Sequence, residues 1–354
     1  MPPDAALYTA LARSGRLDKL VSERVLRKVT CPFDTDYALY EYTSETLFDA
    51  NWSAEAQAAR GLVVDAASGR VLCNPMPKFF NLNEVEATRI KNLPDEPFIA
   101  LEKLDGTLIL VWRDPKRNEW IYNTRGDWKN EFIEWAKELP LDKKNLDPEY
   151  TYSFELIHPK NRIVIDYGAR RELVLVAVRR AGTGEEEPWA RLKLIAGRLG
   201  ASVPREFMDF NFEDTEFEPN QEGYVLLYPG GFRVKVKSPA YVKIARVINA
   251  LGPKLVIDLI RGKEYRAVSQ QVPPHIRQQL DDVASVVRTR HQKLMNEAEK
   301  AMREIQSLPT PKEKALWIQN NLDPEPASVA FALWKDKDPE GTAWNLIRKN
   351  ITRE

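Results

Sequence analysis

The spacing of the apolar residues changes near Ser238-Pro239, and this change most limits how the chain can fold. Before it, short apolar runs, several of them alternating with polar residues, are separated by turns that contain glycine or proline, as is typical of β-strands. After it, glycine is rare and apolar residues recur about every 3.6 positions, most clearly over 276–308, as in amphipathic helices. We therefore expect two domains, a mixed α+β domain over residues 1–240 and an all-helical domain over residues 241–354.

The composition excludes several classes of protein. Among 354 residues, 52 Lys and Arg balance 52 Asp and Glu, so any affinity for nucleic acid must come from local basic patches. Two cysteines and three histidines are too few for a Cys/His zinc site or a disulfide framework. No apolar stretch reaches about 18 residues, and the N-terminus lacks the basic start and apolar core of a signal peptide. We expect a monomeric cytoplasmic protein without membrane association, in the host cytoplasm if a phage encodes it.

Within residues 1–240, the local patterns predict mostly strands. Helices are expected over 4–29, 128–139 and 189–199, and a loop or short helix over 49–59. Strands are expected over 37–42, 60–65, 71–73, 119–124, 150–157, 163–167, 172–178, 223–228 and 232–237.

The stretch 101–112 (LEKLDGTLILVW) has the pattern of a β-hairpin. Apolar residues lead into Glu102 and Lys103, Asp105-Gly106 makes a tight turn, and a second β-branched and aromatic run follows. A lysine held rigidly at the mouth of such a turn, with its amine facing a cleft, suits a covalent nucleophile. Because lysine near an Asp-Gly turn is also common in hairpins without a catalytic role, Lys103 needs support from the rest of the chain.

That support comes from the order of several short motifs. They are a strand entered at Arg60, KFF from Lys78, KLDG from Lys103, FEL around Glu155, and EGYV from Glu222 followed by Lys235 and Lys237. This order resembles the covalent nucleotidyltransferases, namely ATP-dependent DNA and RNA ligases and mRNA capping guanylyltransferases. ARGLVV, PMPKFFNLNE, EKLDGTL, FELIHPKNRIVIDYG, EGYV and FRVKVKSPAYV narrow the resemblance, over about residues 37–245, to the bacteriophage RNA ligase 1 family.

The resemblance implies a fold and a reaction. The fold is a nucleotidyltransferase (adenylation) domain of antiparallel sheets with flanking helices, followed by an all-helical domain that selects the RNA. In the reaction, Lys103 attacks ATP and becomes lysyl-AMP, AMP passes to an RNA 5′-phosphate, and a 3′-hydroxyl then displaces AMP. The natural substrate would be broken RNA such as a nicked tRNA. From residue 245 onward the chain has 18 Lys and Arg against 14 Asp and Glu, a mildly basic tail.

The chemistry explains why cations are needed near the nucleophile. A lysine with a reference pKa near 10.4 pays roughly 4–5 kcal/mol to be a neutral amine at pH 7. Nearby cations lower that cost, and Arg60, Lys235 and Lys237 would supply them once the sheets fold together. They would also offset charge on the phosphates and the departing pyrophosphate. The alternative interpretation is that the alternate lysines of this strand only form a solvent-exposed face.

Two carboxylates are candidates for different roles. The resemblance assigns Glu222 to Mg²⁺, which prefers hard oxygen ligands near phosphates. It assigns Glu155 to the ribose hydroxyls of the nucleotide. Since Glu155 lies in an apolar strand and would be costly to bury unpaired, the alternative is a salt bridge to Arg162 or Arg170.

The remaining site residues also follow from the resemblance. Lys78 and Arg60 would contact phosphate, and arginine suits a bidentate grip. Tyr40 and Tyr241 match positions at the nucleotide site, although a tyrosine is more often part of the core. Glu102 would place adenine, or else be an exposed strand carboxylate.

A few residues have less definite assignments. Tyr167 or Phe79 would stack on adenine, and Arg125 in TRGDW would meet phosphate or the RNA end. His158, beside a proline in a loop, is interpreted as structural. The resemblance also implies a further magnesium ligand in the tail, but the sequence around Glu264 matches too loosely to assign it.

Two other functions remain open at this point. A DNA ligase or capping guanylyltransferase would share the lysine chemistry, but would carry a β-barrel after the lysine strand, against the helical spacing seen here. Covalent loading with ATP rather than GTP would exclude the capping enzyme. An RNA-binding protein without catalysis would leave its lysine unchanged after incubation with ATP and Mg²⁺.

Overall fold

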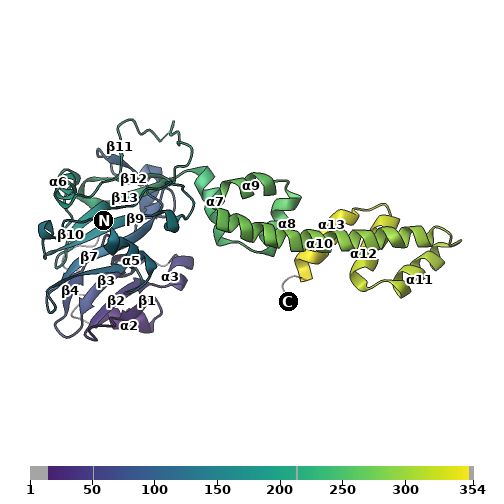
Figure 1. Cartoon of the computed structure of the whole chain (residues 1–354), viewed down its shortest axis with the longest axis horizontal. Coiled ribbons are helices and arrows are strands. Elements are labelled where there is room, and N and C mark those ends of the chain that lie inside the picture. Colours follow the sequence, from purple (N-terminus) through teal and green to yellow (C-terminus); the bar gives the residue numbers. More distant parts are fainter. Residues whose placement is uncertain (1–14, 51, 213, 351–354) are drawn as a thin grey trace. The chain divides into compact units, whose positions relative to one another are not determined.

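The chain forms two compact units, Met1–Tyr241 and Val242–Glu354 (Figure 1). The computed structural model describes residues 15–50, 52–212 and 214–350. Over these residues the first unit combines three β-sheets with helices, and the second contains only helices. The expected fold class, α+β followed by an all-helical region, is confirmed.

The sheets of the first unit are almost entirely antiparallel. Sheet 1 contains, in order, β1 (Leu26–Thr30), β2 (Tyr37–Tyr42), β3 (Arg60–Asp65) and β4 (Arg70–Cys73). Sheet 2 contains β10 (Glu172–Arg180), β9 (Tyr150–Ile157), β7 (Thr107–Asp114) and β8 (Glu119–Thr124). Sheet 3 contains β11 (Glu206–Phe207), β6 (Ile99–Glu102), β12 (Gly223–Leu227), β13 (Arg233–Lys237) and β5 (Phe80–Asn81), of which only β5 is paired in parallel.

Helices of the first unit are short and connect or cover the sheets. The α-helices are α2 (Arg16–Ser22), α3 (Ser44–Phe48), α4 (Ala54–Ala58), α5 (Glu131–Glu138) and α6 (Trp189–Leu199). Single 3₁₀ turns occur at Glu86–Thr88, Ile90–Asn92, Lys143–Asn145, Pro159–Asn161 and Pro229–Gly231.

Sheet 2 is buried on both faces, and β7 runs through its middle. Leu110 and Trp112 belong to a buried cluster shared with sheet 1. Ile109 and Val111 face the other way and share a second cluster with Leu101 of sheet 3. This explains why TLILVW is a continuous apolar run, since successive side chains of a strand point to opposite faces.

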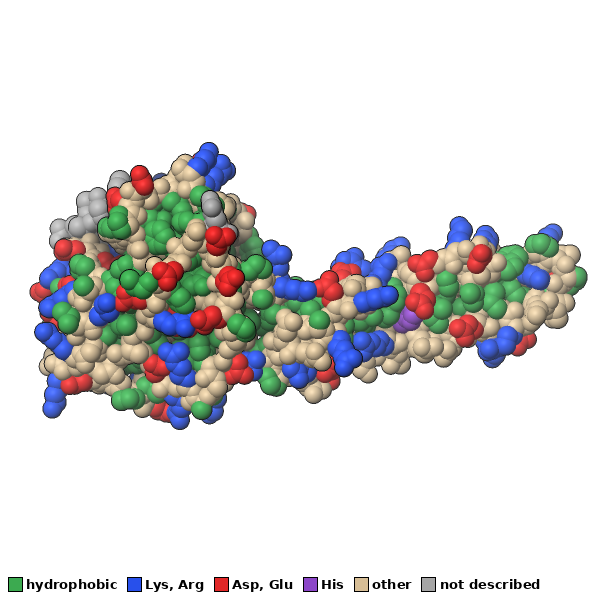
Figure 2. Space-filling model, turned by 90° about the horizontal axis from the view of Figure 1, so that it is seen from above, with side chains coloured by type: hydrophobic (Ala, Val, Ile, Leu, Met, Phe, Trp, Pro, Cys, Tyr) green, Lys and Arg blue, Asp and Glu red, His purple; other side chains and the backbone are tan. Residues whose placement is uncertain are grey.

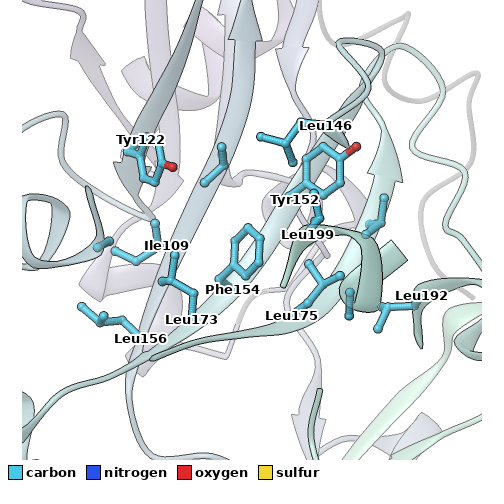
Figure 3. Close-up of a cluster of buried hydrophobic side chains, with 14 of the residues drawn as sticks. Ile109, Tyr122, Leu146, Tyr152, Phe154, Leu156, Leu173, Leu175, Leu192 and Leu199 are labelled. Carbon is cyan, nitrogen blue, oxygen red and sulfur yellow. The ribbon is translucent and has the colours of Figure 1, made fainter. Parts of the chain in front are cut away.

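The second cluster joins sheets 2 and 3 to α6. Phe154 of β9 and Leu175 of β10 lie beside Leu192 and Leu199 of α6 (Figure 3). Phe154 and Leu175 are fully buried. Burying an aromatic or leucine side chain stabilises the fold by about 1.5–3 kcal/mol each, so this cluster fixes the two sheets that meet at Lys103.

The expected hairpin over residues 101–112 does not form. β6 pairs with β11 and β12, whereas β7 pairs with β8 and β9, so the two strands belong to different sheets. Segment 103–106 is the crossing from sheet 3 to sheet 2. It crosses closely, because a Cβ on Gly106 would meet the Leu156 carbonyl oxygen at 2.4 Å.

Two further predictions were wrong. The helix expected over 4–29 is limited to α2 within the described residues, and Leu26–Thr30 forms β1 because it pairs with β2; residues 4–14 lie outside the described residues. The strand expected over 163–167 is a loop whose backbone N–H groups bond to a side chain instead of a neighbouring strand. The other expected strands form, with small shifts at their ends.

The second unit is built around one long helix. Its helices are α8 (Pro253–Arg261), α9 (Tyr265–Gln271), α10 (Pro274–Ile305), α11 (Pro311–Asn321), α12 (Pro324–Trp334) and α13 (Pro339–Asn350), preceded by α7 (Pro239–Asn249) at the boundary. Along α10, Leu280, Val287 and Leu294 are buried, as its apolar spacing predicts. Within the described ranges, none of the helices is both long and apolar enough to cross a membrane.

Candidate active site

A cleft of about 530 Å³ in the first unit is lined by residues from all three sheets. Most of the predicted site residues line it, namely Arg60, Glu102, Lys103, Glu155, Glu222, Lys235, Lys237 and Tyr241. The motifs that are separated in sequence therefore meet at one place.

Lys103 lies just after β6, opposite a buried carboxylate. Its Nζ donates to Glu222 Oε2 at 2.8 Å, and Lys237 Nζ lies 3.0 Å from Glu222 Oε1. Glu222 is only 2% exposed. One buried carboxylate is thus shared by two ammonium groups, and this fixes the Lys103 amine at the cleft wall.

A glycine makes this arrangement possible. Gly223 has φ +147°, and a Cβ on it would meet the Val236 carbonyl oxygen at 2.0 Å. Its own carbonyl accepts from the Lys103 N–H at 2.9 Å. Because Gly223 pairs with Lys237 in the β12–β13 register, the preceding Glu222 lies between the two lysines.

Asp105 anchors the loop that carries Lys103, and the sequence pattern alone indicated only a turn residue. Its Oδ2 accepts from the N–H groups of Val164 (2.8 Å) and Ile165 (3.0 Å). Its Oδ1 accepts from the Tyr241 hydroxyl at 2.7 Å, and its own N–H donates to the Tyr167 hydroxyl at 2.8 Å. Burial and the nearby carboxylates raise the pKa of Tyr241, so this phenol remains a donor. Tyr167 therefore supports the loop rather than lining the cleft.

Glu155 lies behind the same loop without forming the alternative salt bridge. Its Oε1 accepts from the Gly106 N–H at 3.1 Å. Arg162 is paired with Asp166 and Arg170 with Glu172, so neither arginine is its partner. Burial raises the pKa of Glu155 to about 7, and the cations Lys103 and Arg60 only partly oppose this.

This pKa predicts how stability depends on pH. Between pH 4.5 and about 7 the folded state keeps a proton that the unfolded chain releases, so the free energy of unfolding falls as pH rises through this window. Glu155→Gln removes the titration but keeps an acceptor for Gly106. We expect urea denaturation to show similar stability near pH 4.5 and a variant more stable by up to about 3 kcal/mol at pH 8. A variant less stable than wild type at pH 8 would contradict this.

Two cations of the cleft lack a counter-ion. Lys235 Nζ lies 4.3 Å from the centroid of the Phe79 ring, and no ion pair is found for it among the described residues. Burial, with Lys78 and Lys103 nearby, lowers the pKa of Lys235 well below its usual range. Arg60 is half-buried, and its buried Nη1 has no hydrogen-bond partner within the described part of the chain. Such groups are suited to an anionic ligand.

Two predicted residues lie elsewhere. Tyr40 does not line the cleft: it is 3% exposed in the core of sheet 1, where its hydroxyl donates to Asp18 at 3.4 Å. Lys78 lines a separate cavity of about 380 Å³, with its Nζ near the rings of Trp52 and Phe80. Burial lowers the pKa of Lys78 to about 8. The charge of Lys78 helps to lower the pKa of Lys235, but the Lys78 side chain does not line the cleft.

The cleft also contains residues that sequence reasoning missed. Glu41, 4% exposed, is paired with both Arg27 and Arg125. Arg125 was expected at the site, and its Nη1 also donates to the Tyr42 hydroxyl at 2.6 Å. Arg27 and Glu41 gave no signal, because the ion pair of Glu41 with Arg125 and the hydrogen bond from Arg27 to the Gly126 carbonyl join segments far apart in the chain. His158, read as structural, stacks on Trp135 with ring centroids 4.7 Å apart.

Comparisons with known proteins identify the family of the chain and several similar proteins. A family model described as RNA ligase matches residues 58–241, a little over half of the chain. A Thermovibrio ammonificans protein provisionally named RNA ligase is 33% identical over 224 residues, covering 57% of this chain and 56% of that protein. The RNA ligase of Rhodothermus phage RM378 is 23% identical over 318 residues, covering 68% of this chain and 71% of that protein. The matched segment thus spans a little over half the length of the Thermovibrio relative.

Among solved structures, a provisionally named ATP-dependent DNA ligase from Aquifex aeolicus is similar with a TM-score of 0.48 and 12% identity. The similarity covers 80% of this chain and 81% of that one.

Proposed function

Because the chain belongs to the RNA ligase family of the bacteriophage RNA ligase 1 type, we propose that it uses ATP to join RNA ends through an AMP-lysine intermediate on Lys103. The observation that supports this most strongly is the contact of Lys103 with Glu222 in a cleft that also holds uncompensated cations. An amine held in this way, beside groups suited to phosphate, is what nucleophilic attack on a nucleotide requires.

In the first step, the Lys103 amine gives up a proton and forms an N–P bond with the α-phosphate, while the bond to pyrophosphate breaks. Glu222 Oε2 accepts a hydrogen bond from this amine and is placed to take the proton. Lys235, Lys237 and Arg60 offset the negative charge on the phosphate oxygens and on the pyrophosphate.

Two further steps complete the joining. An oxygen of the RNA 5′-phosphate attacks the AMP phosphorus, which breaks the N–P bond and returns Lys103 to an amine. The 3′-hydroxyl of the second RNA end then attacks the activated 5′-phosphate, loses its proton and releases AMP. Arg125, which lines the same cleft, is a candidate to hold the RNA phosphate.

The nucleotide itself would be held by the wall between Lys103 and Phe79. Glu155, adjacent to the lysine loop, would bond the ribose hydroxyls, and Glu102, which also lines the cleft, would place the base. Phe79 lines the cleft and offers a ring to adenine. Tyr241 supports the site through Asp105.

Magnesium fits this cleft only together with the nucleotide. No group of three or more acidic, His or Cys side chains in the described segments is arranged to hold a metal alone. A carboxylate has about four acceptor positions, and Glu222 uses two of them for Lys103 and Lys237. The remaining positions are available to a metal ion. Glu222 would therefore hold Mg²⁺ with phosphate oxygens, where the ion would neutralise phosphate charge.

Loading assays test this function. The chain incubated with Mg²⁺ and labelled ATP or GTP is expected to gain nucleotide from ATP only, and then to seal RNA carrying a 5′-phosphate and a 3′-hydroxyl. Loading from GTP would favour a capping guanylyltransferase. Absence of any covalent nucleotide would favour a non-catalytic RNA-binding protein.

The helical unit is proposed to select the RNA, with a nicked tRNA as the candidate substrate. Its surface carries basic and acidic side chains side by side on the visible face (Figure 2). Ending the chain after Asn249, which keeps α7 complete, is expected to leave AMP loading within about twofold and to reduce sealing of tRNA more than sealing of unstructured RNA. Equal loss of both activities would contradict a separable role.

A further inference from the structure

A second cavity, of about 580 Å³, lies at the other end of β7. Thr107, the first residue of β7, lines the candidate active cleft, whereas Arg113, near the end of the strand, lines the second cavity. Six strand residues span about 20 Å. The second cavity is therefore distinct from the site around Lys103.

The charges lining this cavity are mainly positive. Arg70, Arg113 and Arg180 line it, against one carboxylate, Glu149. Arg180 is paired with Glu149, but Arg70 is exposed and makes no ion pair among the described residues. Within the described part of the chain, the Arg113 side chain donates to the neutral side chain of Asn118 and forms no ion pair. Among these residues, Arg70 and Arg113 therefore have no counter-ion.

The strand register places two of these arginines on aromatic rings. Arg113 is opposite Trp120 in the β7–β8 pair, and its guanidinium carbon lies 5.3 Å from the centroid of that ring. Arg180 is opposite Tyr150 in the β9–β10 pair, at 4.9 Å. Stacking on an aromatic ring fixes the plane of a guanidinium group and leaves its N–H donors at the edge, available to a phosphate.

Apolar side chains form much of the rest of the wall. Leu72, Pro115 and Leu146 line the same cavity. A free inorganic anion gains nothing from such a wall, but a base attached to a phosphate would use both the apolar wall and the arginines.

We propose that this cavity binds nucleotides of the single-stranded RNA substrate at a distance from the reacting end. The inference rests on the proposed function for the identity of the ligand. Bases would pack between the apolar wall and the guanidinium–aromatic pairs, while Arg70 and Arg113 contact phosphates. The ligase would thereby hold the body of the RNA while its end lies near Lys103.

Direct binding to the full chain tests this, with a fluorescent single-stranded RNA of about 20 nucleotides, long enough to pass about 20 Å at 3.4 Å per stacked nucleotide. Arg70→Glu is expected to raise the Kd about tenfold. It is also expected to reduce the slope of log Kd against log salt concentration by about one. The matched control is Arg191→Glu, an equal charge change at an exposed arginine of α6 that lines neither cavity. It is expected to change the Kd less than twofold.

A second variant separates planar stacking from charge. Arg113→Lys keeps the charge but removes the planar guanidinium group that lies on the Trp120 ring. It is expected to weaken RNA binding about threefold to tenfold, with little change in the slope of log Kd against log salt concentration. The proposal is overturned if Arg70→Glu binds RNA as wild type does, or if Arg191→Glu loses as much affinity. AMP loading of wild type is measured in parallel, because its absence would overturn the ligase function and not the cavity.

Discussion

Substituting Lys103 by arginine is expected to reduce AMP loading at least about 10⁴-fold, since removing an enzyme nucleophile costs about 10⁶-fold in a well-studied case. Arginine keeps the positive charge beside Glu222, so the ion pair of the cleft is retained. Its guanidinium group stays protonated at any working pH and has no free electron pair for the α-phosphate. The measurement is covalent transfer of labelled AMP to the protein.

The same variant separates the steps of the reaction. RNA that already carries AMP on its 5′-phosphate needs no lysine nucleophile, so Lys103→Arg is expected to seal it within about tenfold of wild type. Lys91→Arg, at an exposed lysine outside the cleft, is the matched control and should load AMP normally. Loading by Lys103→Arg at the wild-type rate would assign the nucleophile to another residue.

Substituting Glu222 by alanine is expected to lower both stability and AMP loading. Lys103 and Lys237, whose side chains are 18% and 28% exposed, would lose their shared counter-ion. Removing one partner of a buried ion pair costs about 3–5 kcal/mol, and the partial exposure of both lysines places the expected loss near about 3 kcal/mol. AMP loading is expected to fall at least about 100-fold, because the amine loses its proton acceptor and its orientation.

Urea denaturation and AMP loading measure the two effects. Glu102→Ala removes another carboxylate of the same cleft for which no ion pair is found among the described residues, and is expected to cost less than about 1 kcal/mol of stability. Equal stability losses in the two variants would show that Glu222 is not the shared counter-ion of the lysines.

The local sequence pattern was sufficient to predict where most of the strands lie. It was insufficient to predict which strands pair with one another. β9 and β2 form where the sequence predicts them, because runs of β-branched and aromatic residues are bounded by turn residues. The hairpin at residues 101–112 was wrong because β7 is buried on both faces and gains more from sheet 2 than from pairing with β6. An Asp-Gly pair carries no information about such long-range partners.

The candidate site was predictable where motifs carry chemistry. Lys103, Glu222 and Lys237 were expected to act together, and they are in contact in the structure. Tyr40 was expected at the nucleotide but lies in the core of sheet 1, since a tyrosine on a strand gives no sign of which face it takes. The anchoring of Asp105 depends on backbone N–H groups of a loop, which no spacing in the sequence reveals.

The most direct test is to locate the AMP on the wild-type chain. After incubation with ATP and Mg²⁺, intact mass is expected to rise by one AMP, and peptide mapping should place it on the peptide containing Lys103 as an acid-labile phosphoramidate. AMP found on another residue, or no change in mass while RNA ends are still joined, would contradict the account.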